Sequence, residues 1–263
     1  MAYVDAPSEF NVRSIFTSIE GEEKTGKTHL ALTLASPHFK TGVLDLNNGL
    51  GGVVHKRVKE IGSGHIRVAR HLMPEGEDKA KIKTLAKARW AEVRTDFLTS
   101  IKDNRYTFVD SGTEVWLLAR QKSFGDAKAE KGSKAGSLDY EEANSSTRGL
   151  FGMHNQFGNH LVVTHQMDDE WKQQKNPDTG SMKSVRTGKR VFDGFKEIPF
   201  MIEVVLRTEK RVTNEGMFFV ATLVTCRFAP KLEGTEFSEE LGQFNLPFIY
   251  SYITDTEEAF WLR

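Results

Sequence analysis

The sequence predicts an α/β protein with a mainly parallel, twisted sheet, helices on both faces and an antiparallel strand pair late in the chain. Apolar, β-branched runs alternate with runs whose apolar residues recur every three or four positions, as strands and amphipathic helices do. Such alternation is typical of parallel sheets whose crossover helices cover both faces. A glycine-rich turn joins the first predicted strand to the first predicted helix, and it has the spacing of a phosphate-binding loop.

That turn, residues 21–28, is called the phosphate loop and reads Gly-Glu-Glu-Lys-Thr-Gly-Lys-Thr. In this pattern backbone N–H groups surround a polyphosphate, so side chains at Gly21 and Gly26 would obstruct it. Lys27 brings a positive charge to the β- and γ-phosphates, and the Thr28 hydroxyl is placed to ligate Mg²⁺. We therefore expect the whole loop to contact the nucleotide, namely Gly21, Glu22, Glu23, Lys24, Thr25, Gly26, Lys27 and Thr28. ATP and Mg²⁺ are the expected cofactors.

The other elements follow in order around this loop. The first strand is expected over 13–19 and the first helix over 29–35. Apolar runs predict further strands over 41–46, 65–69, 106–110 and 161–164. Helical periodicity predicts helices over 54–61, 78–103, 114–122 and 140–157. The runs 201–206 and 217–225 predict two longer strands that pair antiparallel across a turn at 213–216, since that turn carries glycine and asparagine.

No Pro- or Gly-rich linker divides the chain, so we expect a single domain over 1–263. Residues 1–12 form an N-terminal extension in this interpretation, and residues 232–263 form a C-terminal extension that packs on the core or on a neighbour. Two polar segments, 121–137 and 167–199, break the alternation. Loops this long inside a compact domain are usually functional or disordered.

The composition is that of an ordinary soluble protein and excludes few classes of function. Hydrophobic residues make up 38% of the 263 residues, and 36 basic side chains balance 36 acidic ones, so a nucleic-acid site would need a local basic patch. The single cysteine, Cys226, excludes an internal disulfide framework and indicates a reducing compartment. No apolar run approaches the roughly 18 residues of a membrane span, and no signal peptide is evident. We expect a cytoplasmic protein with no membrane partner.

A second nucleotide motif lies in Tyr106-Thr-Phe-Val-Asp110, an apolar strand that ends in aspartate. At the C-terminal end of a strand, Asp110 would face the phosphates and hold Mg²⁺, usually through the water shell of the ion. Thr28 and Asp110 are therefore the expected metal-site residues.

With these two motifs the chain resembles the RecA-like P-loop ATPases. Leu161-Val-Val-Thr-His-Gln166 is similar to the strand of that family that ends in a γ-phosphate-sensing glutamine, which implies this role for Gln166. The run 222–231 is similar to a late strand whose basic residues reach the nucleotide of a neighbouring subunit. Arg227 occupies one of those basic positions and Thr225 the other. The resemblance therefore implies head-to-tail homo-oligomers, as rings or filaments.

The resemblance spans about residues 14–230 and is strongest to core-only phage RecA-like ATPases that anneal single strands. A lysine inside the phosphate loop, here Lys24, is a feature shared with the KaiC and replicative-helicase branch and with these small phage proteins, which the chain resembles in this respect. RecA-like proteins usually carry a water-activating glutamate two residues after the aspartate that ends the second strand. Here Asp45-Leu-Asn47 places an asparagine there, and a neutral amide orients water but takes no proton. Asp45 and Glu114 are possible substitutes, and we expect slow hydrolysis.

The resemblance also implies a DNA site. In RecA-like proteins a mobile DNA-binding loop follows the sensing glutamine, and segment 167–199 lies in the same place. Between residues 171 and 190 six basic side chains stand against one acidic one, which would supply phosphate contacts and a base-stacking ring. The expected DNA-binding residues are Trp171, Lys172, Lys175, Lys183, Arg186, Lys189 and Arg190. Single-stranded DNA is the expected partner, in recombination or strand annealing.

Four alternatives stay open. A small-molecule kinase would use the same phosphate loop without DNA. A nucleotide-gated scaffold that does not hydrolyse ATP fits Asn47. A nuclease built on the RecA-like core would need clustered carboxylates, of which Asp168-Asp169-Glu170 is the most compact set. Both basic segments, 119–137 and 171–190, can also be plain solvated loops.

Overall fold

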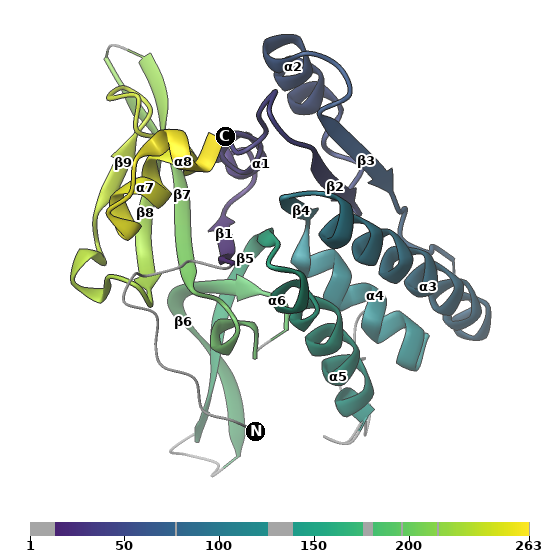
Figure 1. The fold of residues 1–263 in the computed structure, drawn as a ribbon. Helices are drawn as coiled ribbons and strands as arrows, with labels where there is room; N and C mark the ends of the chain where they lie inside the picture. Colours follow the sequence, from purple (N-terminus) through teal and green to yellow (C-terminus); the bar gives the residue numbers. More distant parts are fainter. Residues whose placement is uncertain are drawn as a thin grey trace, which may run out of the picture.

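The computed structural model describes residues 14–76, 78–125, 139–175, 181–195, 197–214 and 216–262. Within these residues one sheet runs in the order β3-β2-β4-β5-β1-β7-β8-β9, and β6 pairs with β5 off this path (Figure 1). The predictions for residues 1–12, for most of segment 121–137 and for residue 263 lie outside the described residues.

The parallel part of the sheet carries the site. Its strands are β1 (Phe16–Gly21), β2 (Thr41–Asp45), β3 (Ile66–Arg70), β4 (Tyr106–Asp110), β5 (His160–Lys175) and β7 (Val204–Thr213). Strand β5 pairs with both β1 and β4 and so lies between them. Because parallel strands end at the same edge of a sheet, the phosphate loop after β1, Asp110 at the end of β4 and Gln166 in β5 come to one edge.

Helices cover both faces of the sheet, and the apolar residues of each strand alternate between two cores. On β5, Val162 joins a core with α1 (Lys27–Leu32) and α7 (Leu246–Thr254). Its neighbours Leu161 and Val163 join the opposite core, which includes residues of α3 (Lys79–Asp103), α4 (Gly112–Phe124) and α5 (Asp139–Gly152). The remaining helices are α2 (Gly51–Ile61), α6 (His154–Phe157) and α8 (Glu258–Leu262). The fold class is as predicted from the sequence.

The late antiparallel pair is also confirmed. Strand β8 (Gly216–Cys226) pairs with β7, and Thr213 lies opposite Gly216 at the turn. Strand β7 begins later than predicted because the backbone N–H groups of Met201 and Ile202 donate to the Ile198 carbonyl of the preceding 3₁₀ turn, η1 (Ile198–Phe200). The short strand β9 (Glu236–Ser238) and the turn η2 (Pro230–Leu232) were not predicted.

The helix predicted over 140–157 is two helices. Helix α5 ends at Gly152 and α6 begins at His154. The buried His154 ring donates through Nδ1 to the Phe151 carbonyl at 2.6 Å, which offers that carbonyl a partner outside the helical ladder. Periodicity alone misses such a break because the apolar spacing continues across it.

The segment predicted as a long loop, 167–199, is mostly strand, and this prediction was wrong. Strand β5 continues to Lys175, and β6 (Met182–Asp193) pairs with it antiparallel. Residues 166–175 and β6 are called the ribbon, which extends from the body of the sheet (Figure 1). Its strands bond to each other while most of its side chains stay exposed. It therefore lacks the alternation that marks a half-buried strand.

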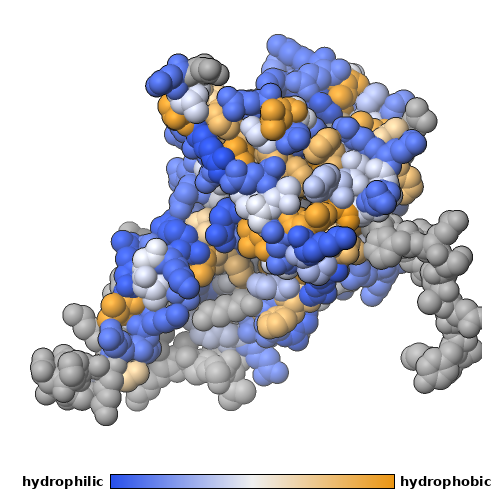
Figure 2. All heavy atoms as spheres, turned by 90° about the vertical axis from the view of Figure 1, so that its left-hand side faces the viewer, coloured by the Kyte–Doolittle hydropathy of each residue, from blue (hydrophilic) through white to orange (hydrophobic). Residues whose placement is uncertain are grey.

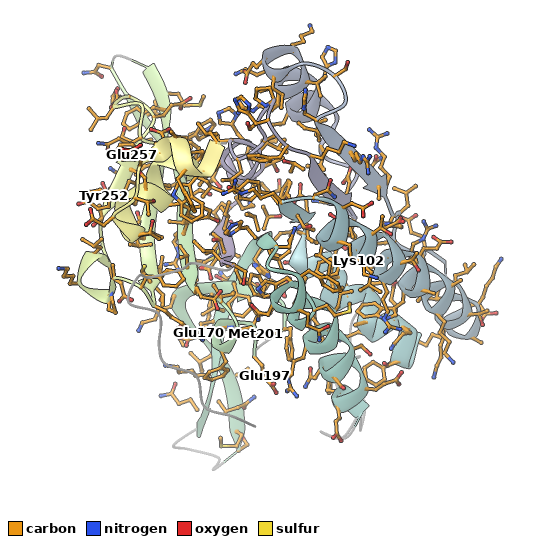
Figure 3. All side chains as sticks on the ribbon, in the orientation of Figure 1. Lys102, Glu170, Glu197, Met201, Tyr252 and Glu257 are labelled. Atoms are coloured by element: carbon orange, nitrogen blue, oxygen red, sulfur yellow. The ribbon has the colours of Figure 1, made fainter. Side chains whose placement is uncertain are left out.

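The C-terminal run packs on its own chain. Phe237, Ile249 and Trp261 belong to the core beside β1 and α1, and the Tyr106 hydroxyl donates to the Trp261 carbonyl at 2.7 Å. Tyr252, labelled in Figure 3, stays partly exposed on α7 and stacks on Phe248. On this side of the molecule hydrophobic residues are interspersed among hydrophilic ones (Figure 2). Among the described helices, none has both the length and the apolar character needed to cross a membrane.

Candidate functional site

Two glycines shape the phosphate loop. Gly26 has φ of 87°, a left-handed conformation that favours glycine, and an added Cβ would lie 3.0 Å from the Phe219 ring. At Gly21 an added Cβ would lie 2.5 Å from Thr208 Oγ1 and 2.7 Å from the Thr208 carbonyl oxygen on β7. The sequence analysis predicted glycine at both positions because a side chain there would obstruct a bound polyphosphate. The structure adds that the protein itself leaves no room for a side chain at Gly21.

The ammonium group of Lys27 contacts backbone carbonyls of the phosphate loop. Its Nζ donates to the Gly21 carbonyl at 2.8 Å and to the Glu22 carbonyl at 2.6 Å. Burial lowers the pKa of the Lys27 ammonium, while the nearby carboxylates of Asp110, Glu22 and Glu23 oppose that shift. The ammonium is thus held against backbone carbonyls of the loop, and its contact with the β- and γ-phosphates stays a prediction.

The two predicted metal-site residues, 82 positions apart in the chain, are in contact. Thr28 Oγ1 donates to Asp110 Oδ2 at 3.2 Å. The buried Thr164 hydroxyl donates to Asp110 Oδ1 at 2.5 Å. Burial raises the pKa of Asp110, and the hydrogen bonds from Thr164 and Thr28 counteract part of that rise. A hydroxyl and a carboxylate are hard oxygen ligands of the kind Mg²⁺ prefers, so the donor set fits this ion.

Asp45 lies directly beside that pair. It is opposite Asp110 in the parallel register of β2 and β4, and its charge contributes to raising the pKa of Asp110. The side chain is 1% exposed, and neither carboxylate oxygen has a hydrogen-bond partner among the described residues. Arg70 Nε, 3.9 Å from Asp45 Oδ2, forms its ion pair. Asn47, by contrast, is exposed past the end of β2.

Glu114, the other possible proton acceptor, lies in the first turn of α4. Its backbone N–H donates to the Ser111 hydroxyl, which caps this helix. Burial raises the pKa of the half-buried Glu114 carboxyl, and the charges of Asp193 and Asp110 raise it further. A carboxylate with a raised pKa is a better proton acceptor near neutral pH. Asp193 was not predicted as a neighbour, because it ends β6 in a segment that was expected to be loop.

Gln166 follows immediately after the β1–β5 pairing ends at Glu20 and His165. Its backbone N–H donates to Thr113 Oγ1 at 3.2 Å, and its side chain is half-buried. Gln166 was expected to end its strand, but β5 continues past it to Lys175. The role of Gln166 as a γ-phosphate sensor stays a prediction.

Arg227 does not join the site of its own chain. It follows β8, whose last residue, Cys226, lies opposite Val204 at the start of β7. Because β7 runs parallel to β1, this end of the sheet is opposite to the phosphate loop. The exposed guanidinium donates to the Phe200 carbonyl at 2.5 Å. Its expected contact with the nucleotide of a neighbouring subunit stays a prediction.

The ribbon distributes its basic residues among ion pairs. Arg186 and Arg190 both contact the Asp169 carboxylate, and Lys172 pairs with Glu170, labelled in Figure 3, at 3.6 Å. Lys189 is exposed. Trp171 lies opposite Arg186 in the register. The side chains of Trp171, Lys175 and Lys183 lie outside the described part of the chain. The local excess of positive charge read from the sequence is therefore partly neutralised within the ribbon.

The acidic cluster 168–170 is engaged in the same pairs. Asp169 binds the two arginines, and the Thr187 hydroxyl donates to Glu170 Oε2 at 2.7 Å. Among the described residues, no group of three or more His, Cys, Asp or Glu side chains is arranged to hold a metal ion. The nuclease alternative therefore gains no support from this cluster.

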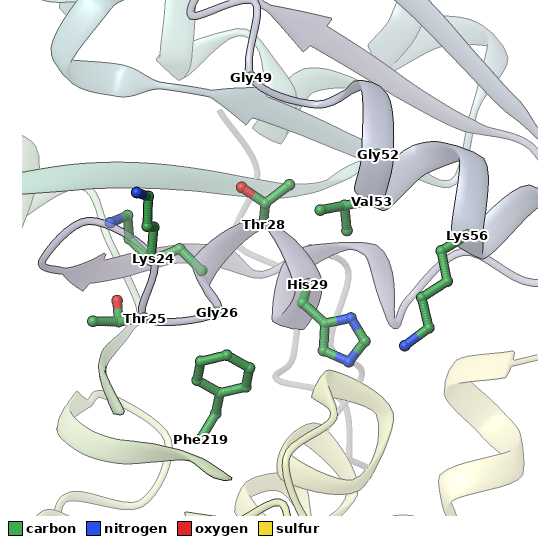
Figure 4. Close-up of a pocket in the computed structure, with 11 residues that line it drawn as sticks. Lys24, Thr25, Gly26, Thr28, His29, Gly49, Gly52, Val53, Lys56 and Phe219 are labelled. Carbon is green, nitrogen blue, oxygen red and sulfur yellow. The ribbon is translucent and has the colours of Figure 1, made fainter. Parts of the chain in front are cut away.

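A cavity of about 490 Å³ opens beside the phosphate loop (Figure 4). Besides loop residues, it is lined by His29, Val53, Lys56 and Phe219, from α1, α2 and β8. None of these residues was predicted as part of the site. They carry no local sequence signal, because only the packing of α2 and β8 around α1 brings them together.

The chain was compared with known families and known proteins. The family described as AAA domain matches residues 15–229. One solved structure similar to this chain is the flagellar accessory protein FlaH from Methanocaldococcus jannaschii, at 14% sequence identity and a TM-score of 0.47. That match covers 85% of this chain and 84% of the other. No curated protein matches the sequence.

Proposed function

Because the chain belongs to the AAA domain family and has a RecA-like P-loop ATPase fold, we propose that it binds ATP with Mg²⁺, hydrolyses it slowly and acts on single-stranded DNA. The observation that carries the nucleotide part is the cluster of Lys27, Thr28 and Asp110. These residues come from the phosphate loop and from a distant strand, yet Thr28 and Asp110 are in hydrogen-bond contact. Lys27 lies within the same charge cluster.

The residues have separate tasks in this proposal. The loop N–H groups and Lys27 hold the β- and γ-phosphates. Thr28 and Asp110 would hold Mg²⁺, which would offset phosphate charge. Glu114 accepts a proton from the attacking water, since its raised pKa makes it a stronger base than an ordinary glutamate. Gln166 senses the γ-phosphate, which is the role that the resemblance to RecA-like ATPases implies for it.

The DNA part rests on the ribbon. Its exposed basic side chains, among them Lys172 and Lys189, lie on a two-stranded element that extends from the sheet (Figure 1). Arg190 of this element contacts Glu22 of the phosphate loop. Phosphate contacts of this kind bind nucleic acid without reading its sequence. We propose a role in recombination or strand annealing, in which binding of ATP and binding of single-stranded DNA are linked.

One experiment tests the proposal. ATP turnover is measured without nucleic acid, with single strands and with duplex, and a fluorescent ATP analogue is titrated against wild type, Lys27→Ala and Lys40→Ala. Lys40 is an exposed lysine outside the site, so its variant is the matched control. We expect Lys27→Ala alone to lose binding or turnover, and single strands to stimulate wild type most. Equal behaviour of all three proteins would refute the nucleotide assignment.

A second candidate, a nucleotide-gated scaffold, is favoured by one observation, the asparagine at position 47. The same experiment separates the two. Tight ATP binding that Lys27→Ala abolishes, without turnover under any condition, would identify the scaffold.

A further inference from the structure

The phosphate loop contains two acidic residues, Glu22 and Glu23, in a place that is expected to hold a polyanion. Like charges this close repel each other. A loop that binds phosphates therefore needs some way to offset these carboxylates. Lys27 is expected to serve the phosphates themselves, so another cation beside Glu22 would favour phosphate binding.

The ribbon supplies that cation through Arg190. Its Nη2 lies 2.7 Å from Glu22 Oε1 and 2.9 Å from Glu22 Oε2. The same guanidinium is anchored on the ribbon, where Nη1 donates to Asp169 Oδ1 at 3.1 Å and Nη2 to the Met167 carbonyl at 3.0 Å. Asp169 lies directly opposite Arg190 in the ribbon pairing. The guanidinium is thus held from one side by the ribbon while it contacts the phosphate loop.

The surroundings show that this contact is a junction of three elements. A cavity of about 450 Å³ is lined by Gly21 and Glu22 of the loop, Arg190 and Lys189 of β6, and Arg207 of β7. Arg207 is already paired with the buried Glu20 at 3.1 Å. Among the cations lining this cavity, Arg190 is the one with a described contact to Glu22.

We infer that Arg190 is a positioning residue of the nucleotide site, through which the ribbon offsets the negative charge of Glu22 and so raises the affinity of the phosphate loop for ATP. This inference rests on the proposed ATP binding. It assigns Arg190 to the nucleotide site rather than to a DNA phosphate, because its guanidinium already serves three acceptors within the chain. Both partners are partly exposed, so salt should weaken the effect.

The test is a double-mutant cycle read by titration of a fluorescent ATP analogue at low and at high salt. Arg190→Ala should weaken binding about two- to fivefold at low salt, the range of an exposed ion pair. The loss should shrink at high salt, and it should vanish in the Glu22→Gln background, where no charge is left to offset. Arg190→Lys, which keeps the charge but loses the fork of donors, should restore part of the affinity.

Arg148→Ala is the matched control, because Arg148 is also an exposed arginine that pairs with a glutamate, Glu197, and neither residue lines the two cavities beside the phosphate loop. Its variant should bind the analogue as wild type does. Thermal unfolding of Arg190→Ala shows whether the variant is folded. The inference is overturned if Arg190→Ala binds like Arg148→Ala, or if its loss persists unchanged with Glu22→Gln. Wild type that binds no ATP, or Lys27→Ala that binds it normally, rejects the proposed function and the inference with it.

Discussion

Replacing Gly21 by alanine should both destabilise the fold and weaken ATP binding. The new Cβ would lie 2.5 Å from Thr208 Oγ1, 2.6 Å from Thr25 Oγ1 and 2.7 Å from the Thr208 carbonyl oxygen. The hydroxyls can rotate away, although Thr25 and Thr208 would then give up their mutual hydrogen bond of 2.9 Å. The carbonyl cannot move freely, because Thr208 lies opposite Gly21 in the parallel pairing of β1 and β7.

The expected cost is therefore about 2–3 kcal/mol, the upper part of the range for overpacking. In a chain of this size each kcal/mol lowers the melting temperature by roughly 2–4 °C, so Gly21→Ala should melt about 4–12 °C below wild type. Adding Thr208→Ala should recover only part of the loss, because it removes the clashing hydroxyl and leaves the carbonyl. Scanning calorimetry measures the melting temperature, and titration of a fluorescent ATP analogue measures binding.

Gly51→Ala is the control for this experiment. Gly51 begins α2, and an added Cβ there meets no atom within 4 Å. Alanine also has the higher helix propensity, by up to about 1 kcal/mol, so this variant should melt at or above the wild-type temperature. If Gly21→Ala melts within about 2 °C of wild type and binds ATP normally, the tight packing of the loop against β7 is refuted.

Four further predictions concern the chemistry and the partners. Glu114→Gln should lower ATP turnover by about 10²–10⁴ while sparing ATP affinity. Because burial and the charges of Asp193 and Asp110 raise the Glu114 pKa above its usual 4.5, the wild-type rate should fall as the pH drops through that raised value, and a pH series should show this limb missing from the variant. Asn47→Glu should raise the slow turnover by adding a second proton acceptor to the one supplied by Glu114, and an unchanged rate would show that position 47 does not reach the attacking water. Lys172→Ala combined with Lys189→Ala should make the slope of log affinity against log salt concentration for single-strand binding shallower by about 0.7 for each DNA phosphate that the variant no longer neutralises. Fluorescence anisotropy of a labelled oligonucleotide measures this slope, and an unchanged slope would mean that the ribbon is solvated surface. Arg227→Ala should abolish nucleotide-promoted self-association in sedimentation, whereas wild type that stays monomeric with nucleotide and DNA would contradict the head-to-tail assembly.

Much of the fold and the centre of the site could be predicted from the sequence, because their signals are local. Glycine at positions 21 and 26, with lysine and threonine following, defines a loop conformation and its chemistry within eight consecutive residues. Short apolar runs mark buried strands wherever they pair. Asp110 could be predicted for the same reason, since the end of a parallel strand leads to the edge where the loop lies.

Contacts between distant segments depend on how the strands are ordered in the sheet, so they could not be predicted from local patterns. Strand order places Thr164 against Asp110 and Thr208 against Gly21, and no local pattern encodes that register. The pocket residues on α2 and β8, among them Lys56 and Phe219, reach the loop for the same reason.

The ribbon shows most clearly why contacts between charged side chains could not be predicted from the sequence. Its sequence reads as a polar segment with a net positive charge, because composition adds charges without regard to distance. Folding places Asp169 between two arginines and brings Arg190 onto Glu22 of the phosphate loop. Electrostatic interactions depend on separations of a few ångströms, and antiparallel pairing sets those separations. The amino-acid composition therefore tells which chemical groups are present at this end of the sheet, whereas the antiparallel pairing decides which of those charges remain available to a partner.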